Sequence, residues 1–189
     1  MRISRFLVTA VALAASLSVV DAQARGRGPG LPAPLKVTIP GYSDGGAIPS
    51  TYGCVAGKSA NISPTIQWSG APEGTESFAV ILHDPDVMLG ADDVLHWAIF
   101  NIPATASGLP EGVPDKDKLD DGSQQLMSVA RRVGYFNPCP PPPTLHHYIL
   151  EVFAVDSKLD SSINSRADLM KALAGHVKAK GTYVGTYHQ

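Results

Sequence analysis

Two segments of the chain carry side chains suited to binding an anion or transferring a proton. In the first, Asp84 and Asp86 flank a proline directly after an apolar run, and His96 opens the next apolar run. In the second, His146 and Tyr148 stand at the start of a third apolar run. Histidine and tyrosine can donate hydrogen bonds to phosphate oxygens, and a carboxylate can orient a histidine or hold an amine. Because binding sites are usually built where a rigid sheet meets its loops, we expect these residues to gather at one end of a sheet.

Each of these residues also has a purely structural interpretation. Pro85 stiffens the backbone between the two aspartates, so the tripeptide predicts a turn in which a carboxylate caps backbone amides. His96 and His146, taken singly, are more typical of buried histidines whose hydrogen bonds are satisfied within the protein. In a strand, His147 points away from the face that His146 shares with Tyr148, which makes it the weaker candidate.

A run of prolines at 138–143, interrupted only by Cys139, lies between two strand signals. Proline does not fit a helix interior or a central strand, and proline runs form stiff extended segments. We interpret the run, and Pro140 within it, as a rigid wall of a small preformed pocket. A proline-rich surface motif that docks a partner is the alternative interpretation.

The first 22 residues predict a secretory signal that is removed from the mature protein. Two arginines precede an apolar stretch at 6–20, and a small-residue cleavage site ends at Ala22. The apolar stretch is too short and too rich in alanine and serine to span a membrane comfortably. We therefore expect cleavage after Ala22, a periplasmic or secreted location, and no transmembrane segment in the mature form.

Residues 23–34 are rich in Gly, Pro and Arg and predict a flexible leader, while residues 35–189 predict one domain. The net charge of −2, without a long basic run, gives nucleic-acid binding little electrostatic support. The chain has two cysteines, Cys54 and Cys139. An even pair in an exported protein indicates a disulfide, and two buried free thiols are the alternative.

From residue 35 onward the pattern is mostly that of β-strands. Strands are expected at 35–39, 66–68, 78–83, 95–102, 148–155 and 181–187. The runs at 78–83, 95–102 and 148–155 are predominantly apolar, which is typical of strands buried on both faces. Ser165 is suited to cap a helix that begins near Arg166 and carries apolar residues at helical spacing as far as Val177. This pattern predicts a mainly β domain, a β-sandwich with a few short peripheral and C-terminal helices.

The candidate segments become more specific when the order and spacing of their motifs are considered together. The motifs are Asp44-Gly-Gly-Ala-Ile-Pro49, Ser63-Pro64, Trp68-Ser69-Gly70, Asp84-Pro85-Asp86, His96-Trp97, Asn101-Ile102-Pro103, Leu109-Pro-Glu-Gly112, Gly134-Tyr135, Pro138-Cys-Pro-Pro141, His146-x-Tyr148 and Gly175-His176-Val177. This series, over residues 35–187, resembles the phosphatidylethanolamine-binding protein family, also called the Raf kinase inhibitor-like family, and in particular its bacterial YbhB/YbcL branch. The resemblance implies an antiparallel β-sandwich with a small anion pocket. The residues that it implies for the pocket are Asp84, His96, His146 and Tyr148, with Asp86 and Pro140 beside them.

The chain departs from the family pattern at the rim of the expected pocket. Val87-Met88 stands where the family usually has Ala-Pro, and Asn137 stands where it has Gly before Pro-Cys-Pro-Pro. Asparagine tolerates a positive φ better than most residues, so we expect the turn to survive with the Asn137 side chain near the pocket entrance. The prolines and Leu145 within 142–145 replace a more polar lead-in.

The resemblance implies a non-enzymatic protein, without a cofactor, that binds a small anion or a phospholipid headgroup of the phosphate or phosphoethanolamine kind. The resemblance is also compatible with a homodimer. One alternative is a metal-dependent hydrolase, for which suitable ligand types are present: His83, Asp84, Asp86, His96 and His146. The sequence lacks the His-Glu-x-x-His and Gly-x-Ser-x-Gly motifs of common hydrolases. Another alternative is an inhibitor of a protein partner such as a protease or kinase, and export argues against a cytosolic kinase.

Overall fold

The computed structural model describes residues 33–58, 60–90 and 92–189. The predicted signal sequence and nearly all of the leader at 23–34 lie outside these residues, so cleavage after Ala22 and the domain boundary at residue 35 stay predictions. Within the described part of the chain, none of the helices has the length and apolar character needed to cross a membrane.

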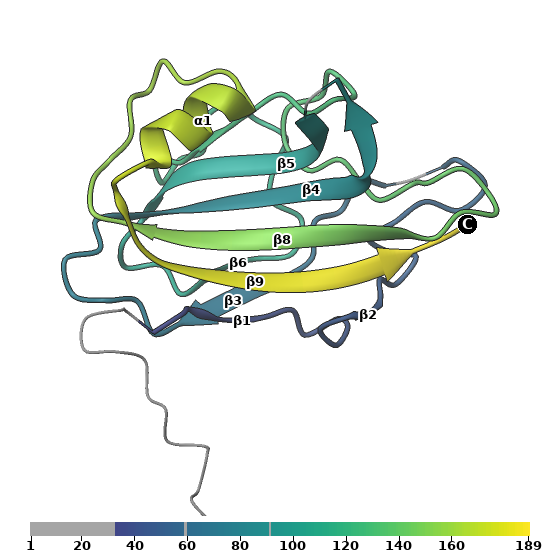
Figure 1. The fold of residues 1–189 in the computed structure, drawn as a ribbon, viewed down its shortest axis with the longest axis horizontal. Helices are drawn as coiled ribbons and strands as arrows, with labels where there is room; N and C mark the ends of the chain where they lie inside the picture. Colours follow the sequence, from purple (N-terminus) through teal and green to yellow (C-terminus); the bar gives the residue numbers. More distant parts are fainter. Residues whose placement is uncertain (1–32, 59, 91) are drawn as a thin grey trace, which may run out of the picture. The chain divides into compact units, whose positions relative to one another are not determined.

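A six-stranded sheet with the strand order β2-β9-β8-β4-β5-β7 forms the centre of the domain (Figure 1). Its four long strands are β4 (Ser77–Leu89), β5 (Asp92–Pro103), β8 (His146–Val155) and β9 (Val177–Tyr187). Its edge strands are β2 (Gly46–Ala47) and β7 (Gln124–Gln125). Neighbours pair antiparallel except β2, which runs parallel to β9. The predominantly apolar runs are confirmed as long inner strands.

A smaller sheet packs against one face of the large one and completes the sandwich. It has the order β1-β3-β6, with strands β1 (Lys36–Thr38), β3 (Ile66–Ser69) and β6 (Gly108–Leu109). Ile66 and Trp68 of β3 point the same way and are buried in one apolar cluster with Phe78 and Val80 of β4. This cluster is the main core of the sandwich, where removal of apolar side chains from water stabilises the fold.

The other face of the large sheet is covered by α1 (Arg166–Leu173), a helix near β5 in Figure 1. Alternate residues of β4, such as Ala79 and Ile81, form a second apolar cluster with Leu169 and Leu173 of the helix. The Ser165 side chain accepts a hydrogen bond from the Asp168 N–H at 3.1 Å, so the predicted N-cap is confirmed.

The predicted extension of this helix to Val177 is wrong. The helix stops at Leu173, and Gly175 takes a positive φ of 85°, which L side chains rarely adopt. Val177 instead begins β9 and pairs with Val155 of β8. Within the described residues α1 is the one helix, where a few short helices were expected.

The β4–β5 hairpin contains irregularities that affect the site. Asp84 pairs with Val94, but the next pair joins Met88 to Asp93, so residues 85–87 bulge out of β4. The Asp-Pro-Asp tripeptide was expected to form a turn after the strand and instead lies inside the extended end of β4. A second shift, between the Leu82–Trp97 and His83–Leu95 pairs, leaves His96 as an extra residue on β5. Such bulges change the direction of a side chain.

Candidate functional site

A cavity of about 180 Å³ is lined by residues of β4, β5 and β8 together with residues of segment 136–141. Its walls are formed by Asp84, Val87, Val94, His96, Phe136, Cys139, Pro140, Pro141, His146 and Tyr148. Five of the six site residues predicted from the sequence therefore meet in one small cavity. The cavity has room for a phosphate-sized group, and ligand binding by these residues stays a prediction.

The wall of the cavity contains a buried aspartate–histidine pair. His146, on β8, places its Nδ1 atom 2.7 Å from Oδ2 of Asp84 on the neighbouring strand β4. Because a carboxylate only accepts hydrogen bonds, Nδ1 carries the proton and donates it to Asp84. The other oxygen of Asp84 accepts the Asp86 N–H at 2.9 Å. This pairing fixes the His146 ring, whose Nε2 atom remains for a ligand.

His96 is held from the opposite wall by the backbone of segment 136–141. Its Nδ1–H donates to the Phe136 carbonyl at 2.9 Å, and its ring stacks on the Phe136 ring with centroids 5.1 Å apart. Burial lowers the pKa of His96, and the Phe136 carbonyl offsets only part of that effect. At neutral pH His96 is therefore uncharged, with the proton on Nδ1 and a lone pair on Nε2.

Tyr148 lines the cavity beside His96 and contributes a hydroxyl group. Its ring meets the His96 ring edge-on, with centroids 5.1 Å apart. Burial, followed by the negative charge of Asp84 and a hydrogen bond to that carboxylate, raises the pKa of Tyr148. The phenol therefore keeps its proton and remains a hydrogen-bond donor across the physiological pH range.

The polar groups of the lining are two imidazoles, one phenol and one carboxylate. The described lining contains no serine, threonine or lysine, and its one cysteine is in a disulfide. In the described ranges, groups of three or more His, Cys, Asp or Glu residues placed to hold a metal ion are absent. The arrangement therefore offers a phenol donor, two imidazole Nε2 atoms, and one carboxylate that can face an amine.

Comparison with known proteins places the chain in a family. The model of the family described as phosphatidylethanolamine-binding protein matches residues 38–188. The chain belongs to this family. A relative named UPF0098 protein in Methanothermobacter thermautotrophicus is 39% identical over 149 residues, which cover 78% of this chain and 95% of the relative. A relative of the same name in Aquifex aeolicus is 35% identical over 156 residues, covering 81% of this chain and 88% of the relative.

Solved structures of phosphatidylethanolamine-binding proteins agree with the fold. The crystal structure of Escherichia coli YbcL, described as a new member of the mammalian family, superposes with a TM-score of 0.74 at 32% identity. The match covers 83% of this chain and 99% of YbcL. The predicted family resemblance and the mainly β sandwich are thus confirmed.

Within this family fold, Asp86 is the one predicted site residue that does not line the cavity. Its carboxylate points to the surface and accepts both the backbone N–H of His147, at 2.6 Å, and the His147 Nδ1–H, at 2.8 Å. The backbone hydrogen bond from His147 is the main reason that the pKa of Asp86 is lowered. Asp86 therefore ties the β4 bulge to β8, and a direct contact with a ligand stays a prediction.

The proline wall of the cavity is fastened by a disulfide between Cys54 and Cys139, whose Cα atoms are 5.3 Å apart. The predicted disulfide is present, and the alternative of two free thiols is wrong. Cys139 and the buried Pro140 both line the cavity, and Gln189 Nε2 donates to the Pro140 carbonyl at 2.7 Å. The C-terminal residue and the loop around Cys54 thus hold this wall in place.

Asn137 does not have the role expected of it at the cavity entrance. It is buried, lacks a positive φ, and donates from its side-chain amide to the Pro138 carbonyl at 3.1 Å. Its backbone N–H donates to Oδ1 of Asn61 at 3.3 Å. The side chain therefore supports the loop from behind and does not narrow the entrance.

Three apolar residues that line the cavity, Val87, Val94 and Phe136, were not predicted as site residues from the sequence. Val87 was identified only as a departure from the family pattern, and Phe136, which follows the Gly134-Tyr135 motif, was not singled out. Val94 carried no signal, because it faces the cavity through its pairing with Asp84 across the hairpin. An apolar wall lowers the local dielectric constant and strengthens the polar contacts that a ligand makes.

Proposed function

We propose that this member of the family is a non-enzymatic binding protein for a small anion or phospholipid headgroup, of the phosphate or phosphoethanolamine kind. The observation that supports the proposal is the Asp84–His146 pair at 2.7 Å in a small cavity that also holds His96 and Tyr148. Phosphate oxygens would accept from the phenol, and from an imidazole only when its Nε2 atom also carries a proton, while the ammonium group would face the Asp84 carboxylate. Export by the predicted signal sequence would place this cavity outside the cytoplasm.

The carboxylate of Asp84 favours a zwitterionic headgroup over a bare dianion. A phosphate dianion alone would be repelled by this negative charge. The neutral His96 supplies no positive charge to offset the repulsion. Phosphoethanolamine carries its own ammonium group, which would neutralise Asp84 while the phosphate remains near the histidines. We therefore expect phosphoethanolamine to bind more tightly than inorganic phosphate at neutral pH.

Replacement of His146 by alanine is expected to weaken binding of phosphoethanolamine by about tenfold or more, since a charge-assisted hydrogen bond is lost. Isothermal titration calorimetry at neutral pH measures this effect. The matched control is His176→Ala, which removes an exposed histidine whose Nδ1 lies 2.8 Å from Asp156, away from the cavity. Equal affinities of wild type and His146→Ala would remove His146 from the site.

The affinity for an anion is expected to rise as the pH falls. Because burial lowers the pKa of His96 below its ordinary 6.5, the free protein lacks this proton at neutral pH. Bound anion favours the imidazolium, so binding takes up a proton, and the affinity rises by up to about tenfold per pH unit for one linked proton. Calorimetry with sulfate, which does not titrate between pH 5.5 and 7.5, measures this effect. The range extends below neutral pH because the pKa of His96 is lowered.

The control for this pH dependence is His96→Asn, which cannot take up the proton and should show a flatter profile. Binding of sulfate that is independent of pH in the wild type would contradict the assignment of His96 as the linked group.

A further inference from the structure

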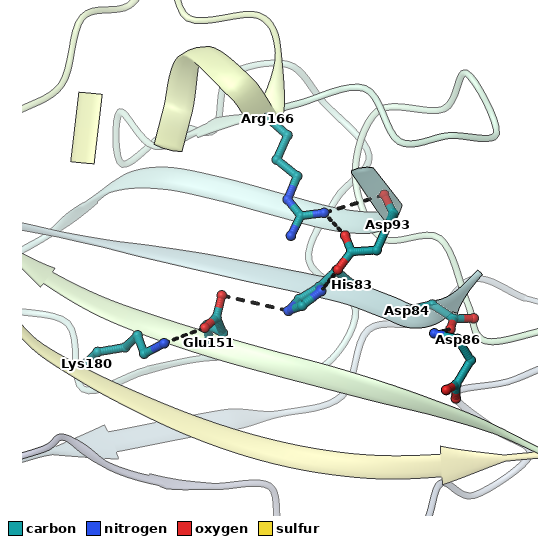
Figure 2. Close-up of polar contacts among 7 residues, drawn as sticks. All are labelled: His83, Asp84, Asp86, Asp93, Glu151, Arg166 and Lys180. Atoms are coloured by element: carbon teal, nitrogen blue, oxygen red, sulfur yellow. Dashed lines mark hydrogen bonds and ion pairs between the residues drawn. The ribbon is translucent and has the colours of Figure 1, made fainter. Parts of the chain in front are cut away.

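On the face of the large sheet that carries α1, charged side chains form a row across four strands (Figure 2). Arg166 of α1 pairs with Asp93 of β5, and the His83 Nδ1–H of β4 donates to the same carboxylate at 2.5 Å. Farther along, Lys180 of β9 donates to Glu151 of β8 at 2.6 Å. Nε2 of His83 is buried 3.8 Å from Glu151, without a hydrogen-bond partner in the described part of the chain. The row thus has two arms with His83 between them. The first arm comprises Arg166 and Asp93, and the second comprises Glu151 and Lys180.

The first arm lies behind the wall of the cavity. The β4–β5 hairpin supplies Asp84, Val87 and Val94 to the cavity on the opposite face of the sheet. Between the Asp84–Val94 and Met88–Asp93 pairs, the regular pairing of the two strands is interrupted by the bulge at 85–87. Backbone hydrogen bonds alone therefore leave the end of the hairpin weakly held.

The contact between His83 and Asp93 bridges this interruption. His83 directly precedes Asp84 on one side of the bulge, and Asp93 pairs with Met88 on its other side. His83 is only 8% exposed, so its hydrogen bond to Asp93 is largely shielded from water. Shielding makes a charge-assisted hydrogen bond stronger than it would be on the surface.

Arg166 connects the same carboxylate to the core. Its guanidinium also donates to the Asp93 carbonyl at 3.5 Å, so it contacts both the side chain and the backbone of the hairpin. The helix that carries it is anchored by the buried Leu169 and Leu173. The end of the hairpin is thus tied, through Asp93, to an element that packs firmly on the sheet.

We propose that Arg166, Asp93 and His83 are positioning residues for the cavity on the other face of the sheet. By bridging the bulge and fastening the hairpin to α1, they set where Asp84, Val87 and Val94 stand and so determine ligand affinity. This inference rests on the proposed function for its binding readout. The Lys180–Glu151 arm joins β8 to β9, does not bridge the bulge, and has no such role.

The test compares Arg166→Met with Lys180→Met, since each removes one cation from the same row. Arg166→Met is expected to weaken phosphoethanolamine binding by about tenfold, the size of effect that residues outside a site can have through a contiguous network. Lys180→Met is expected to leave it within about twofold, the range of an exposed charge change. Asp93→Asn, nearly isosteric, serves as a second variant if Arg166→Met does not fold, and Arg166→Lys should restore part of the affinity.

A readout that needs no ligand is the pair of imidazole NMR signals of His96 and His146. Arg166→Met and Asp93→Asn should shift the His146 signals, because Asp84 moves with the hairpin, and Lys180→Met should not. The inference would be overturned if Arg166→Met and Asp93→Asn both kept unshifted signals and wild-type affinity. It would also be overturned if Arg166→Met, Asp93→Asn and Lys180→Met all lost the same affinity. If the wild type binds neither phosphate nor phosphoethanolamine, the proposed function fails, and the NMR signals still decide the positioning role.

Discussion

Replacing both Cys54 and Cys139 by alanine is expected to lower the free energy of unfolding by about 4 kcal/mol. The disulfide spans 85 residues of sequence, and closing a loop of that length removes much conformational freedom from the unfolded chain. The expected loss is a large fraction of the roughly 5–15 kcal/mol that stabilises an ordinary domain. Urea unfolding of the oxidised wild type and the double variant, followed by circular dichroism, measures the difference.

The same change should also weaken ligand binding. Segment 136–141 supplies Phe136 and Pro140 to the cavity, and the disulfide is the covalent tie that holds it. Wild type treated with a reductant under native conditions is the control, since it should approach the variant in both stability and affinity. A double variant within about 1 kcal/mol of the wild type, well below the expected loop effect, would contradict this account.

Replacing Asp84 by alanine is expected to cost about 3 kcal/mol of stability, because several donors lose their acceptor in a buried position. His146 Nδ1–H and the Asp86 N–H both bond to this carboxylate, at 2.7 and 2.9 Å. Tyr148 loses a hydrogen-bond partner as well. Asp84→Asn should recover part of the loss, because its amide oxygen still accepts from His146. Denaturant unfolding of the two variants provides the comparison.

Asp84→Asn also separates the two headgroup chemistries. The variant keeps an acceptor for His146 but lacks the charge that would face an ammonium group. We expect its preference for phosphoethanolamine over phosphate to fall by about tenfold, the value of one charge-assisted hydrogen bond. Asp156→Asn, which changes the surface pair with His176, is the matched control and should bind both ligands as the wild type does. An unchanged preference in Asp84→Asn would place the ammonium group away from Asp84.

The strands were predictable because their chemistry is local. The run at 78–83 is apolar at five of six positions, and the only place for such a segment is between two packed layers. The N-terminus of α1 was predictable for the same reason, since Ser165 caps it from within the segment. The C-terminal end of α1 was not predictable, because Val177 leaves the helical pattern to pair with Val155 of β8, a contact between separate elements.

The candidate site was predictable in its residue types and less so in its geometry. The order of the motifs pointed to Asp84, His96, His146 and Tyr148, and the structure brings all four together. No local signal distinguished Asp86, whose carboxylate turns to His147, from Asp84, which turns to His146. The bulge at 85–87 makes that difference, and a bulge depends on how β4 pairs with β5.

The family was inferred from the resemblance of ordered motifs, while local residue patterns predicted the apolar strands and the types of side chain available to a ligand. The contacts between strands and helix then showed which aspartate meets which histidine, which apolar residues close the cavity, and that Arg166 lies behind its wall. Those relations depend on strand register and on the packing of a helix against the far face of the sheet. Both are set by contacts between segments that are remote in the chain.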